Sequence, residues 1–245
     1  MRKEAEELAR KAKEALARYA SDLEGFSYSL AHDLRAPLRA MLSFGELIRQ
    51  ADGQHLSSKS CEYLRCIGTS ARRLDELVRD SLSYAKIVSE NMALHPVDVC
   101  RLLRDMLQTY PNLQPSEADL AIECDHAFVL GNEAGLTQCF SNLLGNAVKF
   151  VSPGVRPSVR VSAEDCGERV RIWVEDNGIG IPQDAQEKIF GMFQRLHRSE
   201  AYPGTGVGLA LVRKVVERMG GSAGVQSAPG QGSKFWVELP KPPPA

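Results

Sequence analysis

Apolar and small side chains recur every three or four positions through the N-terminal part of the chain. This spacing places them on one face of an α-helix, in the pattern of a coiled-coil seam. We expect a first helix that ends near Ala51, before Asp52-Gly53, and a second helix with a serine N-cap at Ser57 or Ser58. The seam positions are Ala5, Ala9, Ala12, Leu16, Tyr19, Leu23, Phe26 and Leu30 in the first helix, and Leu64, Ile67, Ala71, Leu74, Val78, Ser81, Ala85 and Val88 in the second.

Two long helices joined by a short polar loop form a hairpin, which leaves apolar stripes uncovered. Pairing two hairpins in a four-helix bundle buries those stripes. We therefore predict a homodimer through the N-terminal helices, with a coiled-coil signalling helix at residues 1–25 and a bundle domain at residues 26–94. The early seam positions are alanines, so this end of the pairing should be weak.

Beyond His95-Pro96, segments whose apolar residues recur at every second position alternate with segments of helical spacing. Period-two alternation, as in the segment VRIWVE at residues 170–175, predicts half-buried strands, and helical spacing returns between them. We interpret residues 95–240 as an α/β sandwich with one mixed sheet and helices on one face, followed by a disordered tail at residues 241–245. Strands are expected at 96–100, 120–124, 128–130, 159–163, 170–175, 223–226 and 234–239, and helices at 101–110, 133–150 and 209–219.

Composition and charge exclude several classes of protein. The formal net charge of −1 gives no basis for nucleic-acid binding. We expect no membrane span and no signal peptide in this chain, a cytoplasmic location, and any sensor domain or anchor outside it. The cysteines show no CxxC pairing, so we expect reduced core thiols at Cys61, Cys66, Cys100, Cys124, Cys139 and Cys166.

His32 is the first candidate for chemistry. It follows the seam residue Leu30 by two positions, so it should face outward from the bundle. The adjacent carboxylate of Asp33 can fix the imidazole tautomer and raise its basicity. A surface histidine is more often only a solvated side chain, and from these residues alone both interpretations stay open.

A second candidate is the segment NLLGNAVKF. Asn142, Asn146 and Lys149 lie at positions i, i+4 and i+7, which is one face of the expected helix. Amide oxygens suit Mg²⁺ and an ammonium group suits a phosphate, so both asparagines are candidate metal ligands. Surface filler is the alternative interpretation.

Two glycine-rich segments complete the set. In DNGIGIP, Asp176 follows a strand, and Gly178 and Gly180 permit close backbone approach, although an ordinary turn has the same composition. The segment lacks the ligand pattern of an EF-hand. GTGVGLAL, at residues 204–211, places glycines before a helix, where free N–H groups bind anions. Its spacing fits neither the dinucleotide fingerprint nor the P-loop. We interpret GQGSKF as a hairpin turn.

Five segments stand in an informative order: HDLRAPL, NLLGNAVKF, DNGIGIP, IFGMF and GTGVGLAL. In order and separation they resemble the H, N, G1, F and G2 boxes of sensor histidine kinases. The resemblance implies a dimeric helical hairpin followed by an ATP-binding domain of the Bergerat type. It implies that His32 is the phosphoryl acceptor and Asp33 its orienting base. Asn142 and Asn146 would hold Mg²⁺ and phosphate oxygens, and Lys149 would contact phosphate.

The resemblance also assigns the remaining site residues. Asp176 would accept a hydrogen bond from the adenine amine, in a pocket shaped by Gly178 and Gly180. Phe190 and Phe193 match the F box, Arg195 would reach the phosphates, and residues 183–202 would include a mobile lid. Residues lining the triphosphate would be Gly204, Thr205, Gly206, Gly208 and Leu209. The family also implies a response-regulator receiver domain as partner, and FSYSLAHDLRAPLRA looks most like the kinases attached to phytochromes.

Gyrase-like and MutL-like ATPases share this nucleotide fold but carry a glutamate one turn before the metal-binding asparagine. Here that position is Asn142, which cannot accept a proton at neutral pH, so we expect a kinase. Ala36, where many relatives carry Thr or Asn, implies weak phosphatase activity toward the regulator. The alternative is a degenerate kinase that serves as a dimeric nucleotide-binding scaffold.

Overall fold

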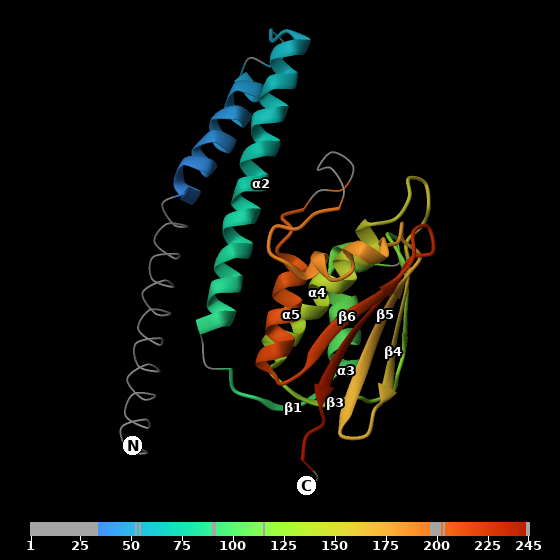
Figure 1. Ribbon diagram of the computed structural model, residues 1–245. Helices are drawn as coiled ribbons and strands as arrows, with labels where there is room; N and C mark the ends of the chain where they lie inside the picture. Colours follow the sequence, from blue (N-terminus) through green and yellow to red (C-terminus); the bar gives the residue numbers. More distant parts are fainter. Residues whose placement is uncertain are drawn as a thin grey trace, which may run out of the picture. The chain divides into compact units, whose positions relative to one another are not determined.

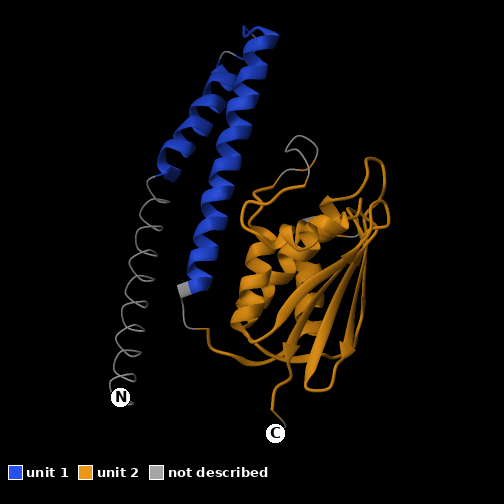
Figure 2. Ribbon diagram, in the orientation of Figure 1, with its two compact units in different colours: residues 1–90 blue, residues 91–245 orange. Residues whose placement is uncertain are grey.

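The computed structural model describes residues 34–51, 53, 55–89, 92–114, 116–196, 202 and 204–243. The chain divides into two compact units, residues 1–90 and residues 91–245 (Figure 2). The predicted coiled-coil helix at residues 1–25, together with His32 and Asp33, lies outside the described residues.

The first unit is a helical hairpin. One helix covers residues 34–51, and the second is α2, Ser58–Ser89. The predicted serine cap is present, because the Ser57 hydroxyl accepts a hydrogen bond from the N–H of Ser60 at 3.1 Å. An ion pair of 3.7 Å between Arg35 and Asp75 joins the two helices.

The second unit is an α/β domain built on a mixed sheet of five strands (Figure 1). The strand order is β2-β4-β5-β7-β6, in which only the β2–β4 pair is parallel. The strands are β2 (Asp119–Glu123), β4 (Ser158–Asp165), β5 (Arg169–Asp176), β6 (Ser222–Ser227) and β7 (Ser233–Pro240). The predicted helical hairpin followed by an α/β domain with a mixed sheet is therefore confirmed.

Three helices cover one face of this sheet: α3 (Val99–Thr109), α4 (Glu133–Lys149) and α5 (Gly208–Arg218). Period-two alternation points Val170, Ile172 and Val174 of β5 toward the helices, where all three are buried. Phe140 of α4 is fully buried among them, so its truncation to alanine would cost about 3–5 kcal/mol. Short 3₁₀ turns lie at η1 (Pro111–Leu113), η2 (Gln183–Ala185) and η3 (Lys188–Phe190).

The opposite face of the sheet is covered by its own side chains. Trp173 of β5 pairs in register with Trp236 of β7, and the Arg171 guanidinium lies over both rings at 5.4 and 4.8 Å. The Lys234 ammonium lies 4.5 Å from the Trp173 ring centroid. These cations and their carboxylate partners leave Trp173 only 8% exposed, so this face needs no helix.

The prediction of one sheet was wrong for two strands. β1 (His95–Asp98) and β3 (Phe128–Gly131) form a separate antiparallel pair. Both are four residues long and lead at once into helices capped by Asp98 and Asn132, so neither extends along the large sheet. The Asp98 cap also begins α3 two residues earlier than predicted, since its carboxylate accepts hydrogen bonds from the N–H groups of Cys100 and Arg101.

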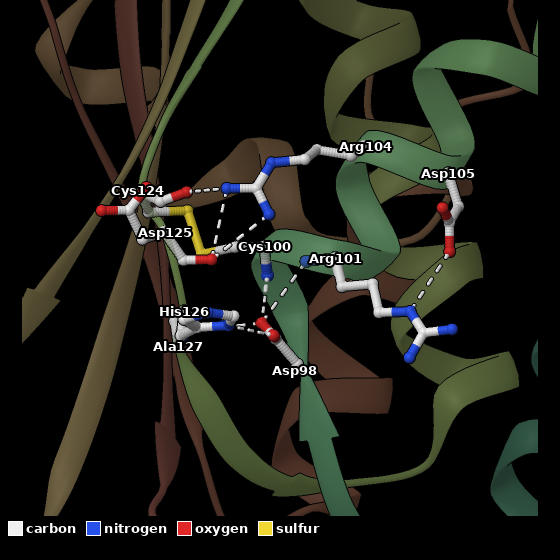
Figure 3. Close-up of polar contacts among 9 residues, drawn as sticks. All are labelled: Asp98, Cys100, Arg101, Arg104, Asp105, Cys124, Asp125, His126 and Ala127. Carbon is white, nitrogen blue, oxygen red and sulfur yellow. Dashed lines mark hydrogen bonds and ion pairs between the residues drawn. A yellow bond between two sulfur atoms is a disulfide. The ribbon is translucent and has the colours of Figure 1, made fainter.

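The expectation of reduced core thiols was also wrong. Cys100, at the start of α3, forms a disulfide with Cys124, immediately after β2 (Figure 3). Cys61, Cys66 and Cys166 are exposed, so only Cys139 is a buried free thiol, and burial raises its pKa to about 12. Tertiary packing brings the two joined cysteines together across 24 residues, which their spacing could not reveal.

Hydrogen bonds surround this disulfide. The Arg104 guanidinium donates to the carbonyl oxygens of Cys124 and Asp125, and the Asp98 carboxylate lies 2.7 Å from Nδ1 of His126 (Figure 3). Burial alone would raise the pKa of Asp98, but hydrogen bonds from His126 and from backbone N–H groups outweigh it and lower that pKa. The segment at residues 124–127 is thus attached to the start of α3 by covalent and polar links.

Loss of the disulfide should destabilise the second unit. A cross-link that closes a loop of this length restricts the unfolded chain by about 3 kcal/mol. We expect Cys100→Ala with Cys124→Ala to lower the free energy of unfolding in urea by that amount, and reductant to lower it similarly in the wild type. Cys166→Ala, at an exposed free cysteine, is the control and should change stability by less than about 0.5 kcal/mol. Equal stability of the double variant would contradict the prediction.

None of the helices in the described part of the chain combines the length and apolar character needed to cross a bilayer.

Candidate functional site

Helix α4 presents the predicted polar face. It begins at an Asn132 cap, and its opposite side is buried in the core through residues such as Leu136, Phe140 and Leu144. Asn142, Asn146 and Lys149 are all half-buried on the remaining side. The Lys149 ammonium lies 3.4 Å from the Asn146 amide oxygen, and the Asn142 amide donates to the carbonyl oxygen of Gln138 at 2.8 Å. The two asparagine oxygens and the ammonium therefore share one face.

Asp176 is the last residue of β5, and two backbone N–H groups donate hydrogen bonds to its carboxylate. Its Oδ1 accepts hydrogen bonds from the N–H groups of Gly178 and Ser233, both at 2.9 Å. In the described part of the chain no hydrogen bond is directed at Oδ2. Burial raises the pKa of Asp176 to about 6 against the opposing effect of these two bonds. A half-buried carboxylate with one oxygen occupied is suited to accept a single hydrogen bond from a ligand.

The glycines after Asp176 allow a close backbone approach. A Cβ on Gly178 would lie 2.5 Å from the carbonyl oxygen of Phe150, at the end of α4. The N–H of Ile179 donates to that same oxygen at 2.9 Å. Gly180 has a φ of +72°, and a Cβ there would overlap the carbonyl oxygen of Ala228. The turn therefore docks against α4 on one side and the β6–β7 connection on the other.

The second glycine-rich segment lies beside α4. A Cβ on Gly204 would lie 3.2 Å from the Lys149 ammonium, and one on Gly208 would overlap the Asn142 amide oxygen. Gly208 is the first residue of α5, so the N-terminal N–H groups of this helix lie near Asn142. Of the other predicted residues, Thr205 accepts a hydrogen bond from the N–H of Val207 at 3.4 Å, and Leu209 is half-buried in the first turn.

The predicted F box has two roles in the structure. Phe190 is buried edge-on against Phe235, with ring centroids 6.4 Å apart, so it belongs to the core. Phe193 is 58% exposed and has a φ of 61°, a strained backbone for a non-glycine residue. Its N–H donates to the carbonyl oxygen of Gly206 at 2.9 Å, which joins the F box to the glycine-rich segment. The expected lid is described up to residue 196 and again at Tyr202.

Three sequence segments thus meet at one place: the end of α4, the turn after β5, and the start of α5. Arg195 is held nearby through its bond to the carbonyl oxygen of Tyr202 at 3.0 Å. Sequence analysis missed Phe150 and Tyr202, whose rings pack 5.3 Å apart, and Ser233, which binds Asp176. The segment GQGSKF, interpreted as a hairpin turn, does connect β6 to β7, and its serine supplies that N–H.

An open groove of about 550 Å³ lies elsewhere in the second unit, over β2, β4 and the end of α3. Leu107, Leu120 and Val159 are among its lining residues, and none of the predicted site residues contributes to it. This groove is therefore separate from the predicted site.

Gly180 offers a test of the site's packing. The contact with Ala228 predicts that Gly180→Ala lowers the free energy of unfolding by at least about 3 kcal/mol. Gly154→Ala is the matched control, since Gly154 also has positive φ, +80°, but a Cβ there would meet open space. Its cost should be only the conformational term of about 1–2 kcal/mol. Urea unfolding of both variants measures the difference, and equal costs would show that the contact is unimportant.

Comparison with known proteins places these features in a family. The family model for the His Kinase A (phospho-acceptor) domain matches residues 22–90, which include His32. The model for the histidine kinase-, DNA gyrase B- and HSP90-like ATPase matches residues 131–243, which include the site described above. Together the two matches follow the order of the two units.

Individual relatives agree. The chain is 31% identical to the phytochrome-like protein Cph1 of Synechocystis sp. over 239 residues, 97% of this chain and 32% of that protein. It is 36% identical to the sensor histidine kinase AruS of Pseudomonas aeruginosa over 227 residues, 87% of this chain and 22% of that protein. The solved structure of full-length ShkA in complex with AMPPNP is 32% identical and has a TM-score of 0.65, covering 89% of this chain and 46% of ShkA.

The chain thus spans about a third or less of the two curated relatives. The phosphoacceptor match precedes the ATPase match along this chain, and the polar site lies within the ATPase match. The chain belongs to the sensor histidine kinases, of which it is a catalytic core.

Proposed function

We propose that this chain transfers the γ-phosphoryl group of ATP to His32 and passes it on to an aspartate of a response-regulator receiver domain. The observation that carries the proposal is the meeting of Asp176, the polar face of α4 and the start of α5 in one domain. Each of these groups is suited to a different part of a nucleoside triphosphate. The family match supports His32 as the acceptor, because His32 lies within the matched phosphoacceptor domain.

The residues present fit ATP. The Oδ2 atom of Asp176 would accept a hydrogen bond from the adenine amine, beside the turn that Gly178 and Gly180 allow to pack against α4 and the β6–β7 connection. The Lys149 ammonium and the N–H groups at the start of α5 would bind phosphate oxygens. We assign the same phosphate region to Thr205, Gly204, Gly206 and Leu209, and place Phe193 and Arg195 at its edge.

The donor set also fits Mg²⁺. Amide oxygens of Asn142 and Asn146 lie on one face, and a side chain at Gly208 would displace the first of them. A metal ion bound there would neutralise charge on the phosphate oxygens. These two asparagines would orient the ion and the phosphates, and neither would supply a base.

The proposed phosphoryl transfer involves few groups. An imidazole nitrogen of His32 attacks the γ-phosphorus, the bond to the bridging oxygen breaks, and ADP leaves with the electron pair. Asp33 orients the ring and stabilises its positive charge. Because Asn142 cannot deprotonate water, hydrolysis of ATP is slow and the γ-phosphoryl group remains available for transfer to His32. Reactive phosphohistidine then serves as donor to the regulator.

The proposed assembly is a homodimer through the helical hairpin. Several large apolar side chains of this unit are exposed in the single chain, from Leu34 at 39% to Phe44 at 65%. A four-helix bundle of two chains would cover them. The exposed set is Leu34, Met41, Phe44, Leu47, Ile48, Tyr63, Ile67, Leu74 and Val88.

The wider context completes the proposal. We place this catalytic core in the cytoplasm, where ATP and receiver domains are available, and downstream of a sensor domain carried elsewhere. A photosensor of the phytochrome type is the sensor that the N-terminal sequence favours. Ala36 is exposed on the first helix and offers only a methyl group, so we propose weak phosphatase activity.

Incubation with ATP labelled at the γ-position tests the function. We expect the protein to incorporate label that is labile in acid and stable in base, as phosphohistidine is. The label should move to a receiver domain when one is added. A degenerate scaffold would bind nucleotide but remain unlabelled. A protein that instead releases phosphate steadily, with no labelled intermediate, would be an ATPase.

A further inference from the structure

Tyr202 connects three parts of the candidate ATP site. Its hydroxyl donates to the carbonyl oxygen of Val151 at 3.0 Å, immediately after α4. Its ring packs against Phe150, with centroids 5.3 Å apart and planes inclined by 39°. Its own carbonyl oxygen accepts a hydrogen bond from the Arg195 guanidinium at 3.0 Å. The residue is half-buried, so these contacts are partly shielded from water.

Phe150 extends this connection to the base pocket and to the phosphate region. Its carbonyl oxygen accepts the N–H of Ile179 at 2.9 Å, which docks the turn after Asp176 against α4. Its ring lies under the Lys149 ammonium, 4.3 Å from nitrogen to centroid. This distance is within the range of a cation–π interaction, which limits where the ammonium can lie.

Lys149 is the last residue in this series of contacts. Its ammonium is 3.4 Å from the Asn146 amide oxygen, and a Cβ on Gly204 would lie 3.2 Å from it. Gly204 follows Tyr202 by two positions, so the same short segment contacts both the ring system and the ammonium. A side chain that holds the Phe150 ring therefore also holds the cation assigned to phosphate.

We propose that Tyr202 is a positioning residue for ATP: by holding the Phe150 ring and the carbonyl oxygen of Val151, it sets the place of the Lys149 ammonium beside the phosphates. This inference rests on the proposed function, because it assigns Lys149 to ATP phosphate. In this proposal Tyr202 acts on ATP through Phe150 and Lys149.

Binding of AMPPNP, measured by isothermal titration in Mg²⁺, tests the proposal through a double-mutant cycle. Tyr202→Ala should weaken binding about tenfold, since one aromatic contact and one hydrogen bond are lost. Tyr202→Phe keeps the ring and should lose about threefold or less. In a Lys149→Ala background, Tyr202→Ala should cost less than about twofold, because the group that Tyr202 positions is absent.

The controls separate this role from folding and from the proposed function. Tyr110→Phe removes a hydroxyl from another tyrosine of the same unit and should leave affinity unchanged. Urea unfolding identifies any variant that is not folded, and Tyr202→Leu replaces Tyr202→Ala in that case. An equal tenfold loss with and without Lys149, or no loss at all, would overturn the inference. Absence of AMPPNP binding by the wild type would overturn the proposed function first.

Discussion

Asp176→Asn should lower the affinity for ATP at least about 100-fold, because a buried donor would face a donor on the base. The Asn oxygen must take the place of Oδ1, where it accepts from the N–H groups of Gly178 and Ser233. Its NH₂ group then takes the place of Oδ2, opposite the adenine amine. Inosine triphosphate has an oxygen at that position and should lose less affinity than ATP.

Titration with both nucleotides measures this exchange. Glu175→Gln is the matched control, since Glu175 is the neighbouring carboxylate in β5 and pairs with Lys234 at 2.8 Å. Its ATP affinity should stay within about twofold of the wild type. If Asp176→Asn bound ATP as the wild type does, Asp176 would not contact the base.

The same substitution should stabilise the folded protein at neutral pH. The pKa of Asp176 is raised from 3.8 to about 6, so the folded state binds a proton more tightly than the unfolded state. Wild-type stability therefore falls as pH rises from about 4 to about 6, by up to about 3 kcal/mol, and stays lower above that range. Asparagine does not titrate, so the variant should lack this fall. Urea unfolding at pH 4 and pH 8 measures it.

ATP affinity should follow the opposite direction with pH. Protonation of Asp176 below about pH 6 removes the acceptor that the adenine amine needs, so wild-type affinity should fall as the solution is acidified through that range. The ionised carboxylate of Asp176 thus lowers the stability of the folded protein and favours ATP binding, a combination that is common at functional residues. An affinity independent of pH between 5 and 8 would separate the carboxylate from the nucleotide.

His32→Gln should reduce incorporation of label from ATP to background, a loss of at least about 10³-fold. Glutamine has nearly the volume of histidine but no nucleophilic ring nitrogen. The ATP site lies in the other unit, so nucleotide affinity should remain within about twofold of the wild type. Loss of labelling with intact binding would assign the phosphoryl acceptor.

His55→Gln is the control for this experiment. His55 lies in the short connection between the two helices of the same unit and is exposed, so its loss should leave labelling intact. Acid-stable label, or label that survives in His32→Gln, would point to a different acceptor residue.

Local sequence patterns determined most elements of the second unit. Local patterns predicted all seven of its strands to within about two residues, and helical spacing predicted α4 and α5 to within about one residue. α3 begins two residues earlier than predicted, because the Asp98 cap ends β1 and begins α3 at Val99. These features depend on neighbours a few residues apart, so the linear sequence contains them.

Some candidate site residues have a local sequence pattern, whereas others are recognised only from tertiary contacts. The polar face of α4, Asp176 and the glycines before α5 were candidates from their local patterns, and the order of the motifs assigned them to the proposed site. Tyr202 was missed because its contacts are with Phe150 and Val151, about fifty positions earlier. A contact between a tyrosine and a ring far away in the sequence leaves no local pattern around the tyrosine.

By itself, the sequence determined the helical and strand segments, the order of the five motifs and, through that order, the family. Only the tertiary structure decided that β1 and β3 form a separate sheet, that Cys100 joins Cys124, and that Ser233 holds Asp176. The reason is physical: periodicity reflects the geometry of neighbouring residues, whereas these pairings arise when distant segments are packed around a common core.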